Sequence, residues 1–395
     1  MLRIKELQDK LLHLVGWEQG FYEGSPRIKE DLTQSESGLY FQQAHPLLTL
    51  ENLTSIAPDF TEADDFSNWL ELKTKASIKK AINRYYNEKV AAKMLATLCE
   101  NKVLFDGAGR LADAIKNQGK TVGLELVPLR AKGVVTRINR IGLQFTEPGE
   151  YTIYLYHSSQ EAPIKVARLT KTKKNSLEWF NLEDWFLPYI GSNDAGGSWY
   201  ICYYQEELPT GSKAINKNRD WSKGPCKDCN PSEYASWQLW SKYLEVHPFS
   251  VLDEVREPNA APDNLTAENK LWDISEMDYH YNTNYGLNLD ITVGCDITDF
   301  ILEQRNIFQE IISLQVAVDM LREFAFNPNV RTNRHSINAS RVDILYELDG
   351  DSSSLKRSGL NYQLDMAFKA VSIVTEGLDR VCLTCKNNGI KYRTI

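Results

Sequence analysis

The stretch Ile141 to Tyr156, IGLQFTEPGEYTIYLY, decides how the centre of this chain folds. Apolar side chains occupy every second position of Ile141–Phe145 and again of Tyr151–Leu155, and Pro148-Gly149 lies between the two runs. A period of two places alternate side chains on opposite faces of a β-strand. The stretch therefore predicts two strands joined by a turn.

The pattern continues on the C-terminal side of this stretch. Ile164–Leu169 follows Pro163, and the aromatic run Ser198–Gln205 (SWYICYYQ) follows Gly196-Gly197. Such spacing of strands and turn signals is typical of a sandwich. Bulky residues on both strand faces indicate that one face packs inward and the other meets a partner or a neighbouring domain. Residues 120–250 are therefore expected to form an antiparallel β-sandwich of the jelly-roll or carbohydrate-module type.

Residues 1–119 have a mainly helical pattern. Leu2–Leu14 is a short amphipathic segment, and apolar residues recur at helical spacing after Asp64, with a break near Tyr86-Asn87. A further helix is expected over Gly109–Lys116, ended by Gly119.

Residues 251–395 also read as helical after a polar linker at 257–270. Asp296 is a suitable N-cap for a long helix that ends at Phe326. The remaining expected elements are helices at Ala339–Leu348 and Leu360–Val374, and a β-hairpin of Arg380–Thr384 and Ile390–Thr394 around Asn388-Gly389. The predicted fold class is thus α+β, with a central jelly-roll-like antiparallel sandwich flanked by helical N- and C-terminal regions and closed by a C-terminal hairpin.

Composition limits the function classes. The chain has 395 residues, enough for two or three structural units, and a net charge of −8. An acidic chain is a poor general binder of nucleic acid or anionic membrane. No secretory leader and no run of ~20 apolar residues is visible. The expected compartment is a reducing cytoplasm, in which a disulfide framework is not expected.

Two C-x-x-C pairs are the most specific motif: Cys226 with Cys229, and Cys382 with Cys385. Two thiolates two residues apart on a turn can bind one metal ion, and four thiolates complete a tetrahedral Zn²⁺ shell. The pairs are candidate ligands of one shared structural Zn²⁺, although more than a hundred residues separate them, far beyond a compact zinc ribbon. Free thiols in turns and a redox dithiol are the alternatives. The remaining cysteines, Cys99, Cys202 and Cys295, are interpreted as packing residues.

Aromatic residues are the second notable feature. Six of the nine tryptophans lie between Trp179 and Trp240. Flat rings can stack on sugars, and they can equally form a core and a protein–protein interface. Trp199, Tyr203 and Trp221 are the candidate interface or glycan-stacking residues.

No recognisable catalytic motif is present, so an enzyme is not expected. Gly107-Ala-Gly109 precedes an expected helix but lacks the βαβ context of a dinucleotide site. The six histidines form no metal-binding pair. Asp349-Gly-Asp351 lacks the later ligands of a calcium loop.

Several segments resemble structural proteins of phages and prophages of Bacteroidetes-type bacteria. These segments are Leu104–Ile115, Ile141–Tyr156, Gly196–Leu208, Val316–Asn329 and Gly377–Tyr392. The resemblance implies a virion component of the tail, baseplate or neck, made in the host cytoplasm and then built into the particle. It implies a homo-oligomer whose partners are its own copies and other virion proteins, and it carries over no catalytic residues. The net charge makes nucleic acid an unlikely partner, and no membrane partner is expected.

Two alternatives from other classes remain open. A carbohydrate-binding β-sandwich module would use exposed aromatic rings of the sandwich. A zinc-dependent or redox enzyme would use the cysteine pairs, with an open coordination position or a reactive thiol.

Overall fold

A computed structural model describes residues 1–20, 24–58, 64–90, 97–107, 113–129, 132–160, 162–189, 197–217, 219–252, 277–326, 341–350 and 358–383. Within these residues the fold is mixed α+β with two antiparallel sheets, which confirms the predicted class at this level. The chain forms two compact units. The sandwich unit comprises Leu95–Asp296 and Gly377–Ile395 together with Met1, and the helical unit comprises Leu2–Met94 and Ile297–Glu376.

This division places the two helical ends of the sequence in one body. The sandwich is inserted between Met94 and Ile297, so the helical unit is assembled from segments some 200 residues apart in the chain. The three consecutive regions expected from the sequence are thus arranged as two units, each described separately below.

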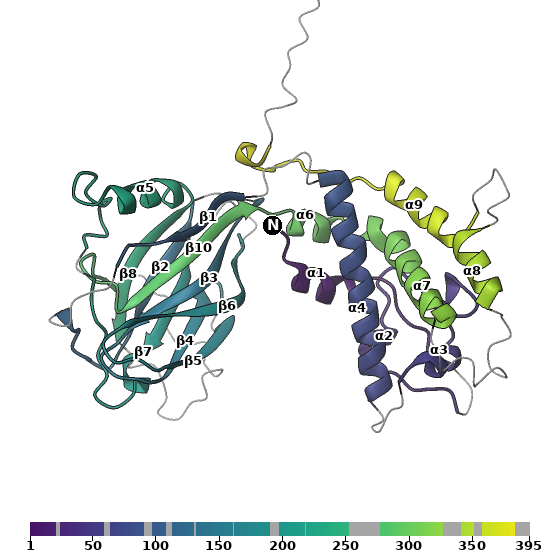
Figure 1. The fold of residues 1–395 in the computed structure, drawn as a ribbon, viewed down its shortest axis with the longest axis horizontal. Helices are drawn as coiled ribbons and strands as arrows, with labels where there is room; N and C mark the ends of the chain where they lie inside the picture. The colour runs from purple at the N-terminus through teal and green to yellow at the C-terminus, as the bar shows by residue number, and fades with distance from the viewer. Residues whose placement is uncertain are drawn as a thin grey trace, which may run out of the picture. The chain divides into compact units, whose positions relative to one another are not determined.

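The sandwich unit holds both sheets (Figure 1). The four-stranded sheet has the order β1 (Thr97–Val103), β10 (Leu287–Cys295), β3 (Val134–Gln144), β6 (Leu177–Leu187). The six-stranded sheet has the order β5 (Lys165–Lys171), β4 (Gly149–His157), β7 (Trp199–Tyr204), β2 (Lys120–Pro128), β8 (Leu244–Leu252), β9 (Met277–Tyr279). The short elements are η4 (Gln205–Glu207), α5 (Pro231–Trp240) and η7 (Arg380–Cys382).

The strand pairing is nested. β4 pairs with β5, β3 with β6, β2 with β7, and β1 with β10, all antiparallel. Pairs β3–β10 and β4–β7 then join these hairpin-like ribbons into sheets. Strands β8 and β9 extend the six-stranded sheet beyond β2. The sandwich therefore draws β1, β9 and β10 from outside the 120–250 range expected from the sequence.

Alternation along the strands creates the core between the sheets. Ile153 and Leu155 of β4, and Ile201 of β7, have no exposed surface. Phe145, next to the end of β3, contacts Tyr203 of β7 at 5.3 Å between ring centroids, which joins the two sheets. Fully burying one such side chain stabilises a fold by about 1.5–3 kcal/mol.

The helical unit is built on a long pair of helices, α4 (Asp65–Tyr85) and α7 (Gln309–Phe326) (Figure 1). Ser77 donates to Asp319 at 2.7 Å, and Lys80 pairs with the same carboxylate at 3.0 Å. The other elements of this unit are α1 (Ile4–Leu11), α2 (Glu30–Thr33), η1 (Phe41–Gln43), α3 (Leu50–Ile56), the π-helical turn η2 (Tyr86–Val90), α6 (Thr298–Glu303), η5 (Arg305–Phe308), α8 (Arg341–Asp349) and α9 (Leu360–Ala370).

The expected helix Asp296–Phe326 is divided into α6, η5 and α7. The break falls at Gln304, whose φ of −112° and ψ of 24° are not helical. The Gln304 side chain accepts from Val374 N and donates to Val374 O, both at 2.8 Å. These bonds tie the Gln304 side chain to the backbone of Val374 at the point where the helix is interrupted.

Three further expectations fall largely outside the described residues. They are the linker at 257–270, the first half of the helix Gly109–Lys116, and the second strand of the C-terminal hairpin. The described second half of that helix, residues 113–116, is not α-helical, because Ala114 forms an isolated antiparallel bridge with Ile215. The first strand of that hairpin was expected at Arg380–Thr384, where the structure has the single turn η7.

Candidate functional site

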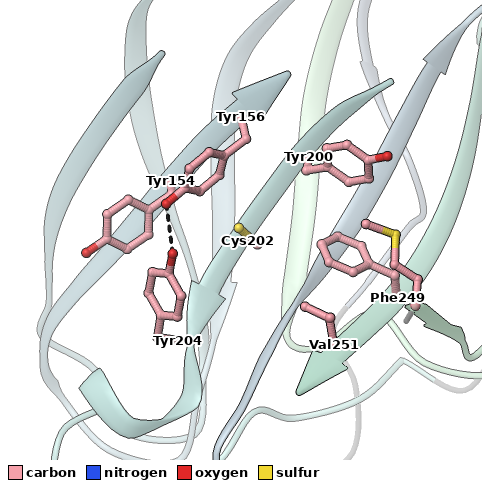
Figure 2. Close-up of a cluster of buried hydrophobic side chains, with 8 residues drawn as sticks. Tyr154, Tyr156, Tyr200, Cys202, Tyr204, Phe249 and Val251 are labelled. Atoms are coloured by element: carbon pink, nitrogen blue, oxygen red, sulfur yellow. Dashed lines mark hydrogen bonds between the residues drawn. The ribbon is translucent and has the colours of Figure 1, made fainter. Parts of the chain in front are cut away.

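Tyrosine side chains cover the face of the six-stranded sheet that points away from the four-stranded sheet. Alternation sets this arrangement, because Ile153 and Leu155 face the core and their neighbours must face the opposite way. Figure 2 shows these side chains from β4, β7 and β8 gathered over the sheet. The cluster, called the tyrosine cluster below, comprises Tyr154, Tyr156, Tyr200, Cys202, Tyr204, Phe249, Val251 and Met277.

The hydroxyl groups of the tyrosine cluster are hydrogen-bonded. The Tyr156 and Tyr204 hydroxyls lie 2.8 Å apart, and Tyr154 donates to Glu207 at 3.0 Å. Tyr200 donates to Glu125 at 3.3 Å. Burial raises the pKa of Tyr156 and of Tyr200 well above the usual range. The cluster members are almost fully buried, so this face is a second core whose polar groups are paired, rather than an open platform.

The aromatic residues singled out from the sequence are buried as well. Trp199 and Tyr203 are 1% exposed and Trp221 is 8% exposed. Trp199 packs against His157, and the Arg219 guanidinium lies 4.5 Å from the Trp221 ring centroid. These rings pack within the sandwich unit and offer no face to a sugar or a partner. Trp199 and Tyr203 belong to β7, as the sequence pattern predicts, and Trp221 lies in a turn; the pattern does not show which of these rings is covered.

The described cysteines of the predicted zinc set are not gathered at one place. Cys226 and Cys229 form a disulfide with each other in the loop before α5. Cys382 of η7 forms a disulfide with Cys295 at the end of β10. Cys385 lies outside the described residues. Among the residues that the structure describes, no three His, Cys, Asp or Glu side chains are placed to hold a metal ion together.

The sandwich unit has a polar pocket of about 300 Å³, called the end pocket below. It lies where β2 begins and β8 ends, and the turn after β9 completes it. Its walls include Lys116, Lys120, Gln205, Ser250, His280 and Tyr285. The lining residues come from five separate parts of the sequence, so no local sequence motif predicts the pocket.

Hydrogen bonds fix the walls of the end pocket. Gln205 Oε1 accepts from the backbone N–H groups of Gln118 and Lys120, at 2.9 and 3.2 Å. The Ser250 hydroxyl lies 3.2 Å from His280 Nε2. Burial raises the pKa of Tyr285 to about 12, and a hydrogen bond with Ser250 opposes this shift.

The backbone of the end pocket is strained at Tyr285, whose φ of 51° is in the left-handed region. Two bonds hold it there: Tyr285 N donates to Thr283 at 3.2 Å, and its carbonyl accepts from the Tyr203 hydroxyl at 3.0 Å. Bulky residues adopt this conformation at a cost, and such strain concentrates at functional sites.

The helical unit presents an apolar surface on the hairpin of α8 and α9. Val342 and Tyr346 lie one helical turn apart on α8 and are 73% and 57% exposed. Tyr362 and Met366 lie one turn apart on α9 and are 37% and 45% exposed. These four side chains are called the α8–α9 stripe below. Ile344 and Leu364, on the opposite faces, are buried against the unit.

The chain was also compared with known proteins. No family model, curated protein or solved structure matches it. In the described part of the chain, no helix combines the length and the apolar character needed to cross a bilayer.

Proposed function

We propose that this protein is a structural component of a phage or phage-like particle, in its tail, baseplate or neck. It acts by self-assembly and by contacts with other particle proteins. The observation that carries this proposal is the α8–α9 stripe. Its four large exposed side chains form i, i+4 pairs on two helices that contact each other, and exposed apolar surface marks interaction sites.

The occupant that we propose for the stripe is the same surface of a second copy. Two-fold pairing is the commonest symmetry of homo-oligomers, and it needs a face that can pair with itself. The four stripe side chains carry no charge, and the exposed carboxylates of Asp343 and Glu347 adjoin Val342 and Tyr346 in the sequence.

The strand pairing supports a finer fold assignment. We infer that the sandwich is a jelly roll formed by β1 to β7 and β10, with β8 and β9 as an edge extension. The nested antiparallel pairs β4–β5, β3–β6, β2–β7 and β1–β10 support this inference. In a jelly roll, pairs of this kind form one long antiparallel ribbon that folds over into two sheets. Jelly rolls occur in viral capsid proteins and in lectins, so the fold alone does not choose between these functions.

The test combines oligomeric state with particle composition. Sedimentation of the purified protein is expected to show a self-associated species. The double variant Val342→Asp and Tyr346→Asp is expected to shift it toward monomer. Leu72→Asp is the matched control, because Leu72 is an exposed leucine of α4 outside the stripe. Mass spectrometry of purified particles is expected to find the protein; a monomer at high concentration that is absent from particles contradicts the proposal.

The carbohydrate-module alternative depended on exposed aromatic rings. Since Trp199, Tyr203 and Trp221 are buried, no platform of these residues supports it. A ligand in the end pocket is a separate question, which does not depend on the stacking residues.

A further inference from the structure

Two lysine side chains line the end pocket, although the protein as a whole is acidic. The chain has a net charge of −8, yet the titratable side chains lining the pocket, among the residues that the structure describes, are Lys116, Lys120, His280 and Tyr285. None of these carries negative charge at neutral pH, because lysine and histidine are cationic or neutral and a tyrosine hydroxyl is protonated. The pocket is therefore electrostatically suited to an anion.

Two carboxylates lie close to this charge: Glu206, whose Oε1 approaches Gly119 next to Lys120, and Asp278. Asp278 pairs with Lys120 Nζ at 3.3 Å, and its side chain is 64% exposed while that of Lys120 is 18% exposed. Because the Asp278 carboxylate is open to solvent, this pair contributes little to stability. A bound anion would therefore compete with Asp278 for Lys120 at a small cost.

The remaining walls offer hydrogen bonds to hydroxyl groups. Ser250 is 2% exposed and forms part of the wall, and the Gln205 amide is oriented by the two backbone N–H groups that it accepts from. Because the Gln205 oxygen is occupied, its nitrogen is directed elsewhere as a donor. Asn282 adds a second amide, on the exposed rim. Cationic groups mixed with amides and hydroxyls match a ligand that carries both negative charge and several hydroxyls.

We propose that the end pocket binds an anionic monosaccharide, a sugar that carries a carboxylate or a phosphate. The pocket volume of about 300 Å³ is at the small end of ligand sites, which suits one ring rather than a chain. Lys116 and Lys120 bind the anionic group, and the Ser250, His280 and Gln205 side chains bind ring hydroxyls. This inference is independent of the α8–α9 stripe and goes beyond the proposed structural role.

Calorimetric titration of the full-length protein tests this proposal with four probes: glucuronate, glucose 6-phosphate, glucose and inorganic phosphate. Binding of glucuronate or glucose 6-phosphate at least tenfold tighter than glucose is expected, and it should weaken with added salt. Whichever of the two anions binds more tightly identifies the anionic group. Inorganic phosphate should bind more weakly than the sugars, because it leaves the hydroxyl-binding groups unused.

Variants locate the binding. The double variant Lys116→Gln and Lys120→Gln is expected to weaken the anionic sugar at least tenfold. Lys242→Gln, which removes an exposed lysine beyond the other end of β8, should leave binding unchanged. Circular dichroism of each variant checks that the fold is retained. The proposal is overturned if no anionic sugar binds at millimolar concentration, or if the double variant, still folded, binds as tightly as the unchanged protein.

Discussion

Cys295 and Cys382 are bonded through their sulfur atoms, with their Cα atoms 5.6 Å apart and a separation of 87 positions in the sequence. The bond joins the end of β10 to η7, the C-terminal segment of the sandwich unit. Cys295 had been interpreted as a packing residue and Cys382 as a zinc ligand, so the pairing assigns a different role to both. A disulfide and a shared zinc site predict different chemical states of these cysteines in the purified protein.

Peptide mapping distinguishes the disulfides from the predicted shared zinc site. Proteolysis without reductant is expected to yield a cross-linked peptide containing Cys295 and Cys382, which separates into two after reduction. A disulfide that closes a loop of this size stabilises a fold by about 3–5 kcal/mol in the chain-entropy treatment, so Cys382→Ser should lower the denaturation midpoint. One equivalent of zinc, together with free Cys226 and Cys229, would instead support the four-thiolate site.

The hydroxyl pair of Tyr156 and Tyr204 predicts a measurable stability effect. Tyr156→Phe removes one partner of a buried 2.8 Å hydrogen bond while keeping the ring. Loss of a buried hydrogen-bond partner costs about 1–3 kcal/mol. Urea unfolding should show a loss in that range, whereas Tyr281→Phe, at an exposed tyrosine outside the α8–α9 stripe, should change the free energy by less than about 0.5 kcal/mol. If Tyr156→Phe lowers the free energy of unfolding by no more than the control does, the hydroxyl pair contributes nothing to stability.

The raised pKa values of the buried tyrosines predict alkaline unfolding. Burial raises the pKa of Tyr156, Tyr200 and Tyr203 above the usual range, whereas unfolded tyrosines titrate near pH ~10. Below that pH both states hold these protons, so the groups leave the free energy of unfolding unchanged. Above it the unfolded state binds fewer protons than the folded state, so stability falls as pH rises.

Two measurements over pH 8 to 11 check this prediction. The urea midpoint should be constant up to about pH 9 and then fall. Phenolate absorbance of the buried tyrosines should appear together with loss of the near-ultraviolet circular dichroism signal. Complete tyrosine ionisation near pH 10 with the fold intact would show that these rings are accessible to water.

The sequence predicted strands best where alternation was flanked by turns. The runs around Ile141–Tyr156 became β3 and β4, and SWYICYYQ became β7. Strand β10, Leu287–Cys295, also alternates but was not predicted; its polar residues Asn288 and Asp290 lie on the face opposite the buried Leu287 and Leu289. Asn288 and Asp290 are buried, and Asn288 donates to the Phe105 carbonyl at 3.0 Å. Polar residues satisfied by distant partners look like loop residues in the sequence alone.

The local sequence pattern does not show which distant segments of the chain pack together. The amphipathic faces of α4 and α7 predict two helices, but not that Ser77 meets Asp319 across 242 positions. The end pocket has the same origin: Lys120, Ser250 and His280 become neighbours only once β2, β8 and β9 are paired. Its residues carried no local motif, so the sequence offered the cysteine pairs and tryptophans as candidates instead.

The buried ion pair of Arg219 and Glu233 gives the last prediction. Their side chains are 6% and 8% exposed, with 3.2 Å between Nη1 and Oε1, and Arg219 also donates to the Leu104 carbonyl at 2.6 Å. Burial lowers the pKa of Arg219, and the Glu233 carboxylate opposes this. The pair thereby ties the first turn of α5 to the segment after β1. Asn230, the N-cap of α5, donates to the other Glu233 oxygen at 3.0 Å.

Removing one charge of this pair should cost more than removing both. Arg219→Met leaves the Glu233 carboxylate buried with the Asn230 amide, and breaking a buried pair in this way costs about 3–5 kcal/mol. The double variant Arg219→Met and Glu233→Gln removes the unpaired charge, so it should recover part of that loss. Urea unfolding followed by tryptophan fluorescence measures the three free energies, with Trp221 next to the pair as reporter. Additive losses in the double variant would show that the two side chains act independently, and that α5 is held by its cap and apolar contacts alone.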